Sequence, residues 1–176
     1  ILVSNRQGSY NLTKHLIDQG YKHIGIVAGS IDSTTGHERL MGYYQALEES
    51  NIEIDKRLIK IGDFLGNSSY ENSKELFSER ICDAVYAGNN IILSGVLKAM
   101  KEMNIKYPKD IGLVVFDDLE WMEYCPISIT AVKQPTYEIG TLAMKTLLNR
   151  IAGSRKKPKE ILLDVTLQIR DSSKQK

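Results

Sequence analysis

Two adjacent carboxylates, Asp117 and Asp118, directly follow an apolar run over residues 111–116. Such a run is typical of a buried parallel strand, and open α/β folds bind their ligands at the carboxyl edge of the sheet. A carboxylate at that edge can accept protons from the hydroxyl groups of a polyol, whereas a pair of carboxylates can hold a divalent cation for phosphoryl transfer. The function of this chain is therefore expected at the carboxyl edge of its sheet.

Residues that could complement these carboxylates follow other predicted strands. Thr35 and Arg39 follow the first strand, Phe64 the second and Asn89 the third. An arginine in the first turns of a helix can form paired hydrogen bonds with a carboxylate or a vicinal diol. Phe64 offers a flat apolar face for a sugar or a purine, and Asn89 both donates and accepts hydrogen bonds. Together with Asp117, these residues predict a polyol-binding site.

Each of these residues also has a purely structural interpretation. Arg39 could form an ordinary ion pair, and Phe64 could belong to the core. Asn89 could simply cap a helix, which is the commoner use of asparagine before a helix, and Asp117 or Asp118 could cap whatever follows the strand. Their convergence on one edge of one sheet is what favours a site.

No metal site is expected. His15, His23 and His37 lack the spacing of a metal-binding motif. Metal-assisted phosphoryl transfer needs further carboxylates and a phosphate-binding lysine, and Asp63 is the sole additional acid at the predicted strand ends. We expect neither a metal nor another cofactor, and a magnesium-dependent phosphoryl-transfer enzyme is kept as the alternative from a different functional class.

The elements that must position these residues alternate along the chain. Predicted helices run from Gly8 to Gly20, through the apolar positions 40–47, from Ser68 with its capping-box partner Glu71 to about residue 77, from 91 to about 104 and from 136 to 152. Strands are predicted at 1–3, 23–28, 58–61, 84–87, 111–116, 127–132 and 161–169. Strands that alternate with helices predict an α/β fold with a three-layer parallel-sheet lobe.

Composition restricts the functional class. The 176 residues are 42% hydrophobic, enough for one compact lobe, and 23 basic against 22 acidic residues give a net charge of +1 without a basic surface for nucleic acid. Cys82 and Cys125 are far apart and are expected to be free thiols in a reducing compartment. No signal peptide or membrane-spanning run is visible, so we expect a soluble piece without membrane contact. Because the sequence starts in mid-strand without methionine, we expect it to be a fragment.

Five short segments resemble, in the same order, the LacI/GalR family of bacterial transcription repressors. They are Gly20-Tyr21-Lys22-His23-Ile24, Thr35-Gly36-His37-Glu38-Arg39-Leu40-Met41-Gly42-Tyr43, Gly62-Asp63-Phe64, Phe116-Asp117-Asp118 and Ile129-Thr130-Ala131-Val132-Lys133-Gln134-Pro135. Each segment alone is a weak signal, but the combination covers essentially the whole chain and is highly specific.

The resemblance implies a type I periplasmic-binding-protein-like domain with two lobes. Family members carry an N-terminal helix-turn-helix, a hinge helix and then this domain. We therefore expect residues 1–176 to be a truncated effector-binding domain, with the C-terminal lobe at about 8–130 and 160–172 and without the DNA-binding domain. Helix 136–152 would belong to the missing N-terminal lobe. Its apolar face would then be uncovered, so the helix should swap onto a neighbouring chain, swing away or be unusually mobile.

The family's effector contacts, carried over by the resemblance, fall on Thr35, Arg39, Phe64, Asn89, Asp117 and Gln134. The implied function is effector sensing, most simply of a sugar or sugar phosphate, with ligand in the cleft shifting the DNA affinity. Two positions depart from the family pattern, because Asn90 replaces a common aspartate and Val115 a common glycine. The lost carboxylate makes a phosphorylated sugar or a protein corepressor easier to accommodate.

The resemblance also implies a cytoplasmic homodimer that reaches operator DNA only through the absent N-terminal domain. A bulky apolar loop, with Trp121, Met122 and Tyr124, is expected at the dimer interface. The alternative within the same fold is a periplasmic-type sugar-binding transport receptor, since its topology would be shared.

Overall fold

A computed structural model describes residues 1–64, 66–78, 80–155 and 157–175. Its main sheet has six strands in the order β3-β2-β4-β5-β6-β8, and only β8 is antiparallel to its neighbour. The strands are β2 (Ile24–Ala28), β3 (Ile59–Ile61), β4 (Ala84–Ala87), β5 (Gly112–Phe116), β6 (Thr130–Lys133) and β8 (Thr166–Gln168). The predicted α/β fold with a mainly parallel sheet is confirmed.

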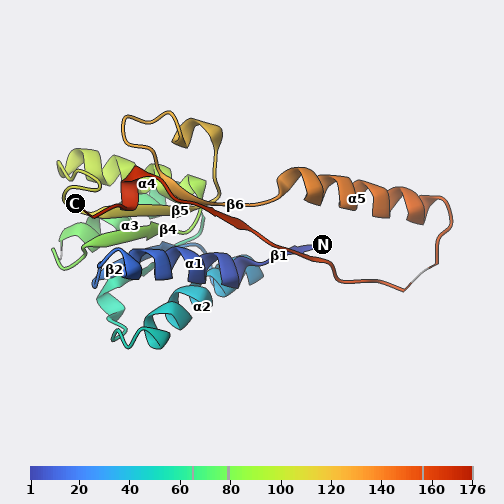
Figure 1. The fold of residues 1–176 in the computed structure, drawn as a ribbon, viewed down its shortest axis with the longest axis horizontal. Helices are drawn as coiled ribbons and strands as arrows, with labels where there is room; N and C mark the ends of the chain where they lie inside the picture. Colours follow the sequence, from blue (N-terminus) through green and yellow to red (C-terminus); the bar gives the residue numbers. More distant parts are fainter. Residues whose placement is uncertain (65, 79, 156, 176) are drawn as a thin grey trace.

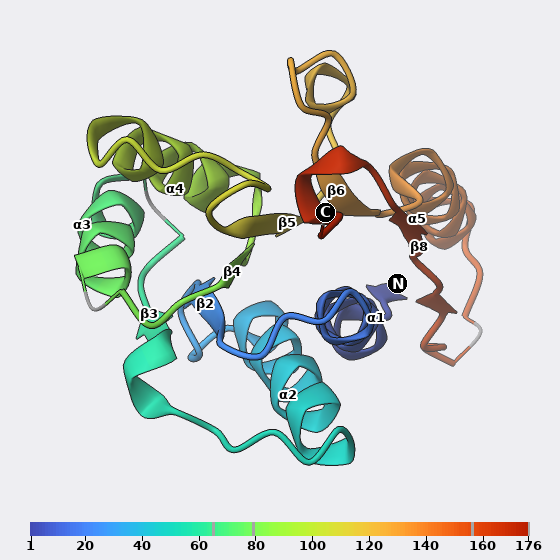
Figure 2. The same ribbon diagram turned by 60° about the vertical axis from the view of Figure 1, so that its left-hand side comes forward.

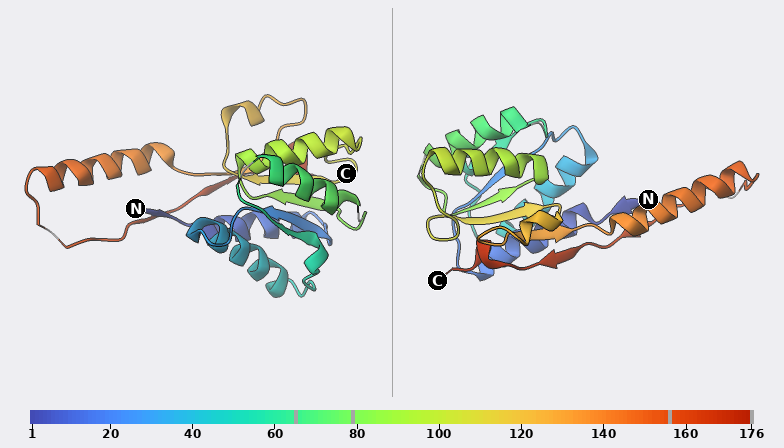
Figure 3. Two further views of the ribbon diagram at one scale, coloured as in Figure 1. Left: turned by 180° about the vertical axis from the view of Figure 1, so that it is seen from behind. Right: turned by 90° about the horizontal axis from the view of Figure 1, so that it is seen from above.

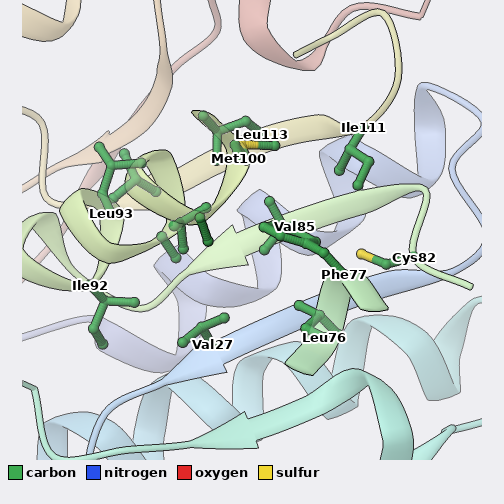
Figure 4. Close-up of a cluster of buried hydrophobic side chains, with 14 of the residues drawn as sticks. Val27, Leu76, Phe77, Cys82, Val85, Ile92, Leu93, Met100, Ile111 and Leu113 are labelled. Carbon is green, nitrogen blue, oxygen red and sulfur yellow. The ribbon is translucent and has the colours of Figure 1, made fainter. Parts of the chain in front are cut away.

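Helices cover both faces of this sheet, which gives the three predicted layers (Figure 2). Helices α1 (Asn5–Asp18) and α2 (Thr34–Glu49) cover one face, and α3 (Gly66–Ser78) and α4 (Asn90–Glu102) cover the other. Neighbouring residues of a strand serve opposite faces: Val85 packs in the α3–α4 cluster, whereas Tyr86 packs in the α1–α2 cluster. Figure 4 shows the α3–α4 cluster, in which Leu93 and Met100 of α4 pack toward the sheet.

Several element boundaries differ from the prediction. Helix α1 begins at Asn5 instead of Gly8, although Gly20 does end it in the left-handed conformation with a φ of 97°. Helix α3 already includes Gly66, so the predicted capping box that starts at Ser68 is wrong. The predicted strand at 161–169 is two short strands in different sheets, β7 (Leu162–Leu163) and β8, because only β8 reaches the main sheet.

A long excursion leaves the body at the carboxyl edge of the sheet and returns there (Figures 1 and 3). It contains α5 (Thr136–Ile151) and then β7, which pairs in parallel with β1 (Leu2–Val3) beside the N-terminus. No residue of α5 is buried, and the apolar residues Met144, Leu147, Leu148 and Ile151 are exposed. The helix thus extends from the body with its apolar face uncovered, while its assignment to a second lobe stays a prediction.

The C-terminal segment forms hydrogen bonds with both β5 and β6 at the opposite, amino edge of the sheet. Ser172 Oγ donates to the Leu113 carbonyl oxygen at 2.5 Å and accepts from the Thr130 backbone N at 2.8 Å. Ser173 Oγ lies 2.8 Å from His15 Nε2 of α1, and both serines are fully buried. Among the described helices, none is long and apolar enough to cross a membrane.

Candidate ligand-binding site at the carboxyl edge of the sheet

An arginine and a carboxylate form the centre of the candidate site. Arg39 of α2 is only 5% exposed, and its Nη1 lies 3.5 Å from Asp117 Oδ2 at the end of β5. The guanidinium also donates from Nε to Asn5 Oδ1 at 3.0 Å and from Nη1 to the Gly88 carbonyl oxygen at 2.7 Å. Its Cζ lies 3.7 Å from the centre of the Phe116 ring, within the range of a cation–π contact. These contacts fix the guanidinium at the point where three strands end.

The start of α2 explains why Arg39 faces the sheet. Ser33 caps the helix, because its side chain accepts from the Gly36 backbone N at 3.0 Å. Arg39 then lies on the buried stripe with Leu40 and Tyr43, which pack against the sheet. A buried guanidinium requires partners, and the strand ends supply them. Nη2 of Arg39 makes no hydrogen bond with any residue that the structure describes.

Asp117 and Phe64 both adopt an unusual backbone conformation. Their φ angles are 79° and 62°, in the left-handed region that residues other than glycine, asparagine and aspartate rarely adopt, so Phe64 is the more unusual of the two. Asn51 and Asn104 share positive φ, but each follows the last turn of a helix, where such a conformation is common. Asp117 and Phe64 instead follow strands, and strained residues at strand ends are characteristic of functional sites.

The ring of Phe64 lies directly over Gly29. A Cβ atom added at Gly29 would come within 2.1 Å of the ring, so only glycine fits beneath it. The backbone of Gly29 in turn touches Gly88, where an added Cβ would lie 3.4 Å from the Gly29 N. Phe64 also packs partly against the α3–α4 cluster, so its core interpretation is also valid. The aromatic face is thus linked, through two glycines, to the carbonyl group that holds Arg39.

Asn89 takes the structural role that was weighed for it. It is 9% exposed, and its Oδ1 accepts from the Ile92 backbone N at 2.7 Å, which makes it the N-cap of α4. Its Nδ2 group has no hydrogen-bond partner in the described part of the chain. Since the preceding Gly88 carbonyl binds Arg39, the asparagine is a neighbour of the central pair.

Thr35 lies to one side of the central pair. It borders a hollow of about 640 Å³ between the β1–β7 ribbon and the first turns of α1 and α2, together with Ser4, Asn5, Glu38 and Asp164. Gln134, by contrast, reaches the centre, because its Nε2 donates to Asp117 Oδ1. The structure therefore gathers all six predicted residues at one edge, with Arg39, Asp117 and Gln134 in direct contact; ligand contact by any of them stays a prediction.

Asp118 does not act with Asp117. Its two oxygens accept from Arg170 at 2.8 and 2.9 Å, and Arg170 also donates to the Ile129 carbonyl oxygen at 2.7 Å. Hydrogen bonding to Asp118 raises the pKa of Arg170 above its ordinary value. The two carboxylates are thus assigned to different partners, and no group of three potential metal-binding side chains exists among the described residues.

A buried tyrosine lies close to the central pair. Tyr86 of β4 is fully buried, and its hydroxyl has no hydrogen-bond partner among the described residues. Burial raises the pKa of Tyr86 to about 12, and the charge of Arg39 opposes part of that shift. The phenol therefore stays neutral, and the guanidinium rests on apolar surroundings that strengthen its polar contacts.

The loop after Asp118 is only partly exposed. Trp121 and Tyr124 are 45% and 73% exposed, as a contact surface requires, but Met122 is fully buried in the α3–α4 cluster. The short turn Glu120–Met122 directs the methionine inward, and its carbonyl oxygen accepts from the Ile129 backbone N at 3.0 Å. The prediction that Met122 lies on a dimer surface is wrong, because an apolar side chain in this loop also serves the core.

Sequence reasoning missed two partners of Arg39. Asn5 lies in the first turn of α1, 34 positions before Arg39, and Gly88 contributes only its backbone. The position of Asn5, two residues after β1, was a signal of the same kind as that of Asn89, two residues after β4. Nothing in the sequence, however, indicates which polar residue at a strand end will meet which other one.

Comparison with known proteins assigns the family. The sequence model of the periplasmic binding protein-like domain matches residues 13–173. This chain belongs to that family. Curated relatives include the HTH-type transcriptional repressor PurR of Shigella dysenteriae, 33% identical over 156 residues that make up 88% of this chain and 46% of PurR, and PurR of Escherichia coli at 32%. The chain spans about half the length of these relatives.

Solved structures agree with this assignment. The transcriptional regulator CelR in complex with cellobiose is 31% identical, with a TM-score of 0.89 over 97% of this chain and 52% of CelR. The regulator CcpA of Lactococcus lactis is 28% identical, with a TM-score of 0.88 over 98% of this chain and 64% of CcpA. These matches confirm the resemblance to LacI-type transcriptional regulators that the sequence motifs indicated.

Proposed function

We propose that this chain is the C-terminal part of the effector-sensing domain of a LacI-type transcriptional regulator. The observation that carries the proposal is the contact of the buried Arg39 with Asp117 at the carboxyl edge of the sheet. The chain that forms this sheet belongs to the family of the periplasmic binding protein-like domain. A buried guanidinium, whose Nη2 group bonds none of the described residues, beside a partly exposed carboxylate suits a polar small molecule.

The arrangement favours a sugar or a sugar phosphate as effector. Asp117 can accept from hydroxyl groups, while Arg39 Nη2 and Asn89 Nδ2 can donate to ring or phosphate oxygens. The Phe64 ring can stack on the apolar face of a sugar, and Thr35 extends the polar wall toward the β1–β7 ribbon. CelR was solved with cellobiose, and a LacI-family regulator of Enterococcus faecium, 25% identical, with ribose.

The proposed mechanism is a shift between open and closed lobes. In this proposal the described lobe forms one wall of the cleft. Helix α5 and the β1–β7 ribbon extend away from the carboxyl edge of its sheet (Figure 1), and the second lobe would lie on that side. A ligand that binds the closed arrangement better than the open one shifts the population toward the closed one, and only this difference in affinity can change operator binding. Operator DNA would be bound by a part of the regulator outside this chain.

The relatives favour one of the two alternatives within the fold. The curated proteins that match are described as transcriptional repressors, and the solved relatives cited above are described as regulators. A transport receptor is therefore the less supported reading. The exposed Trp121 and Tyr124 are proposed to contribute to a homodimer, without Met122.

Titration of the full-length regulator with cellobiose, ribose, ribose 5-phosphate and adenine, followed by melting temperature, tests the proposal. At least one compound should raise the melting temperature. Arg39→Lys and Asp117→Asn should each weaken its binding tenfold or more, because each removes a charge-assisted hydrogen bond. Glu120→Gln, in the exposed loop just beyond the site, is the matched control and should leave binding unchanged. Equal binding by Asp117→Asn and the unmodified protein would contradict the site.

Sedimentation analysis tests the proposed homodimer. Tyr124→Ser combined with Trp121→Ala should raise the monomer fraction, because both side chains are exposed and large. A dimer that persists unchanged at micromolar concentration in this double variant would show that the interface lies elsewhere.

A further inference from the structure

Three segments of the chain leave the body at the same edge, and we call them the links. They are residues 1–4, residues 134–135 and residues 161–165, which precede α1, precede α5 and precede β8, respectively. The first and third links are joined to each other by the β1–β7 pairing and by Ser4 Oγ, which donates to Asp164 Oδ1 at 3.1 Å. Any movement of a second lobe relative to this body has to act through these links.

Asn5 connects the first link to the candidate site. Its Oδ1 accepts from Arg39 Nε at 3.0 Å, while its Nδ2 donates to the Val3 carbonyl oxygen at 3.2 Å. One amide group thus uses its acceptor for the buried guanidinium and its donor for the backbone of the link. Val3 is itself held in the ribbon by pairing with Leu163 of the third link.

Gln134 connects the second link to the same site. Its Nε2 donates to Asp117 Oδ1, while the other oxygen of this carboxylate faces Arg39. Gln134 directly follows β6 and is followed by Pro135, after which α5 begins. The carboxylate is therefore held between the guanidinium and the residue at which the chain leaves the body.

We propose that the chain Asn5–Arg39–Asp117–Gln134, here called the relay, couples occupancy of the ligand site to the positions of the links. In the relay, Asn5 and Gln134 are positioning residues: Asn5 orients the guanidinium and Gln134 orients the carboxylate. This inference rests on the proposed function for its ligand, but the contacts that form the relay do not depend on it.

The physical basis of the relay is that Arg39 and Asp117 have few unused hydrogen-bonding positions. Arg39 already donates to Asn5 and Gly88, and Asp117 already accepts from Gln134. A ligand that engages Nη2 of Arg39 or the free lone pairs of Asp117 therefore fixes the pair, and through it the two amides. A position of the links that pulls Asn5 or Gln134 away from the pair must weaken ligand binding. Because coupling is reciprocal, the bound ligand disfavours that position of the links by the same factor.

A double-mutant cycle tests the relay without any ligand. Gln134→Ala should lower the melting temperature of the regulator by about 2 to 4 °C, the size expected for one lost side-chain hydrogen bond, and Asn5→Ala should lower it further, because it removes two. The double variant should lose clearly less than the sum, because cutting one end of the relay loosens the contact at the other end. Gln7→Ala is the matched control: its amide donates to Asn11 within α1, away from the relay, so its effect should add to that of Gln134→Ala.

A strictly additive result for Asn5→Ala with Gln134→Ala would overturn the relay. Asn5→Asp provides the second variant if Asn5→Ala fails to fold, since its carboxylate keeps a charged acceptor for Arg39 but cannot donate to Val3. Asn5→Asp breaks the contact with the link but keeps the contact with the guanidinium. In a cycle with Gln134→Ala, its deviation from additivity should therefore be smaller than that of Asn5→Ala.

Scattering in solution tests the coupling itself, with the compound from the four-member panel that binds most tightly as probe. Asn5→Asp should bind this probe within about threefold of the unmodified protein, because the guanidinium stays oriented, but should lose the decrease in radius of gyration on saturation. Asn5→Ala should bind about tenfold more weakly. A normal compaction of Asn5→Asp would contradict the coupling through Asn5.

Failure of the relay and failure of the proposed function give different results. If no compound in the panel binds, the proposed ligand class is wrong, while the double-mutant cycle still decides whether the four side chains act together. If a compound binds but both cycles are additive, the ligand site stands and the relay is refuted.

Discussion

Helices α4 and α5 have similar lengths and similar apolar stripes but opposite surroundings. Six of the 13 residues of α4 are buried, whereas none of the 16 residues of α5 is buried. The difference lies in what covers each helix: α4 rests on the sheet and on α3, while α5 extends beyond the carboxyl edge of that sheet. An amphipathic stripe therefore shows that a helix has a face to bury, but not that its own chain supplies the cover.

The same division separates the two adjacent carboxylates. Asp118 is directed to the body, where Arg170 satisfies both its oxygens, and its side chain is 7% exposed. Asp117 is directed to the edge, where its partners are Arg39 and Gln134, and its side chain is 23% exposed. Residues that serve stability and residues available for a ligand thus stand next to each other in the sequence, on either side of one peptide bond.

Matched leucine truncations in the two helices should give the largest contrast. Leu93→Ala in α4 should lower the free energy of unfolding by about 3 kcal/mol, because Leu93 is fully buried. Leu148→Ala in α5 should change it by less than about 0.5 kcal/mol, because this side chain is 57% exposed. Urea unfolding of the two variants measures both values. Equal losses would show that α5 is covered in solution, by a second lobe or by a second chain.

Replacing each carboxylate should give a smaller contrast of the same kind. Asp118→Ala should cost roughly 2 to 3 kcal/mol of unfolding free energy, since it leaves the largely buried Arg170 without its charged partner. Asp117→Ala should cost about 1 kcal/mol, because its ion pair with Arg39 is long, at 3.5 Å, and the guanidinium keeps its hydrogen bonds to Asn5 and Gly88. Chemical denaturation again provides the measurement, with Glu120→Ala as control. The reverse order of the two losses would contradict the assignment of Asp118 to the body.

Lowering the pH should destabilise the body and leave the excursion unaffected. This effect should be smaller than those of the leucine and carboxylate replacements. Burial lowers the pKa of His15 below its ordinary value of about 6.5, and the charge of Asp18 opposes this in part. The unfolded chain therefore binds more protons than the folded one just below pH 6.5, so stability contributed by neutral His15 is present above that pH and is lost as the pH falls through this window. His15→Gln, which keeps a donor for Ser173, should flatten the slope of melting temperature against pH.

Asp18, Lys14 and Ser173 surround His15 from its own helix and from the C-terminal segment. Asp18→Asn serves as the control for this prediction, since it removes the charge that favours protonation and should steepen the loss of stability in acid. A slope that is the same in His15→Gln and in the unmodified protein would assign the acid sensitivity to other groups.

The order of strands and helices was predictable because each element carries its own period and its own ending. Gly20 ends α1 and Asn89 begins α4 through local backbone chemistry, and both could be read from a few neighbouring residues. Arg39 and Asp117 were predictable as neighbours, since parallel strands place their carboxyl ends together, whereas Gln134 was predicted only through the resemblance to a family.

Pairings across long stretches of sequence were not predictable. Asp118 and Arg170 are 52 positions apart, and Asn5 and Arg39 are 34 positions apart. Which polar side chains meet depends on the exact register of neighbouring strands, and a single sequence does not reveal it. The burial of Met122 was missed for a related reason: a short turn decides whether an apolar loop residue faces solvent or core.

The antiparallel pairing of β6 with β8 has a topological consequence. Lys133 and Thr166 lie opposite each other on these neighbouring strands, so residues 134–165 form the connection of a single, very long hairpin. A two-residue turn is the usual way to join strands in this register. If a short turn replaced residues 134–165, β6 and β8 could still pair in the same register. In topological terms the excursion is therefore an insertion, whose removal or exchange would leave the strand order of the sheet unchanged.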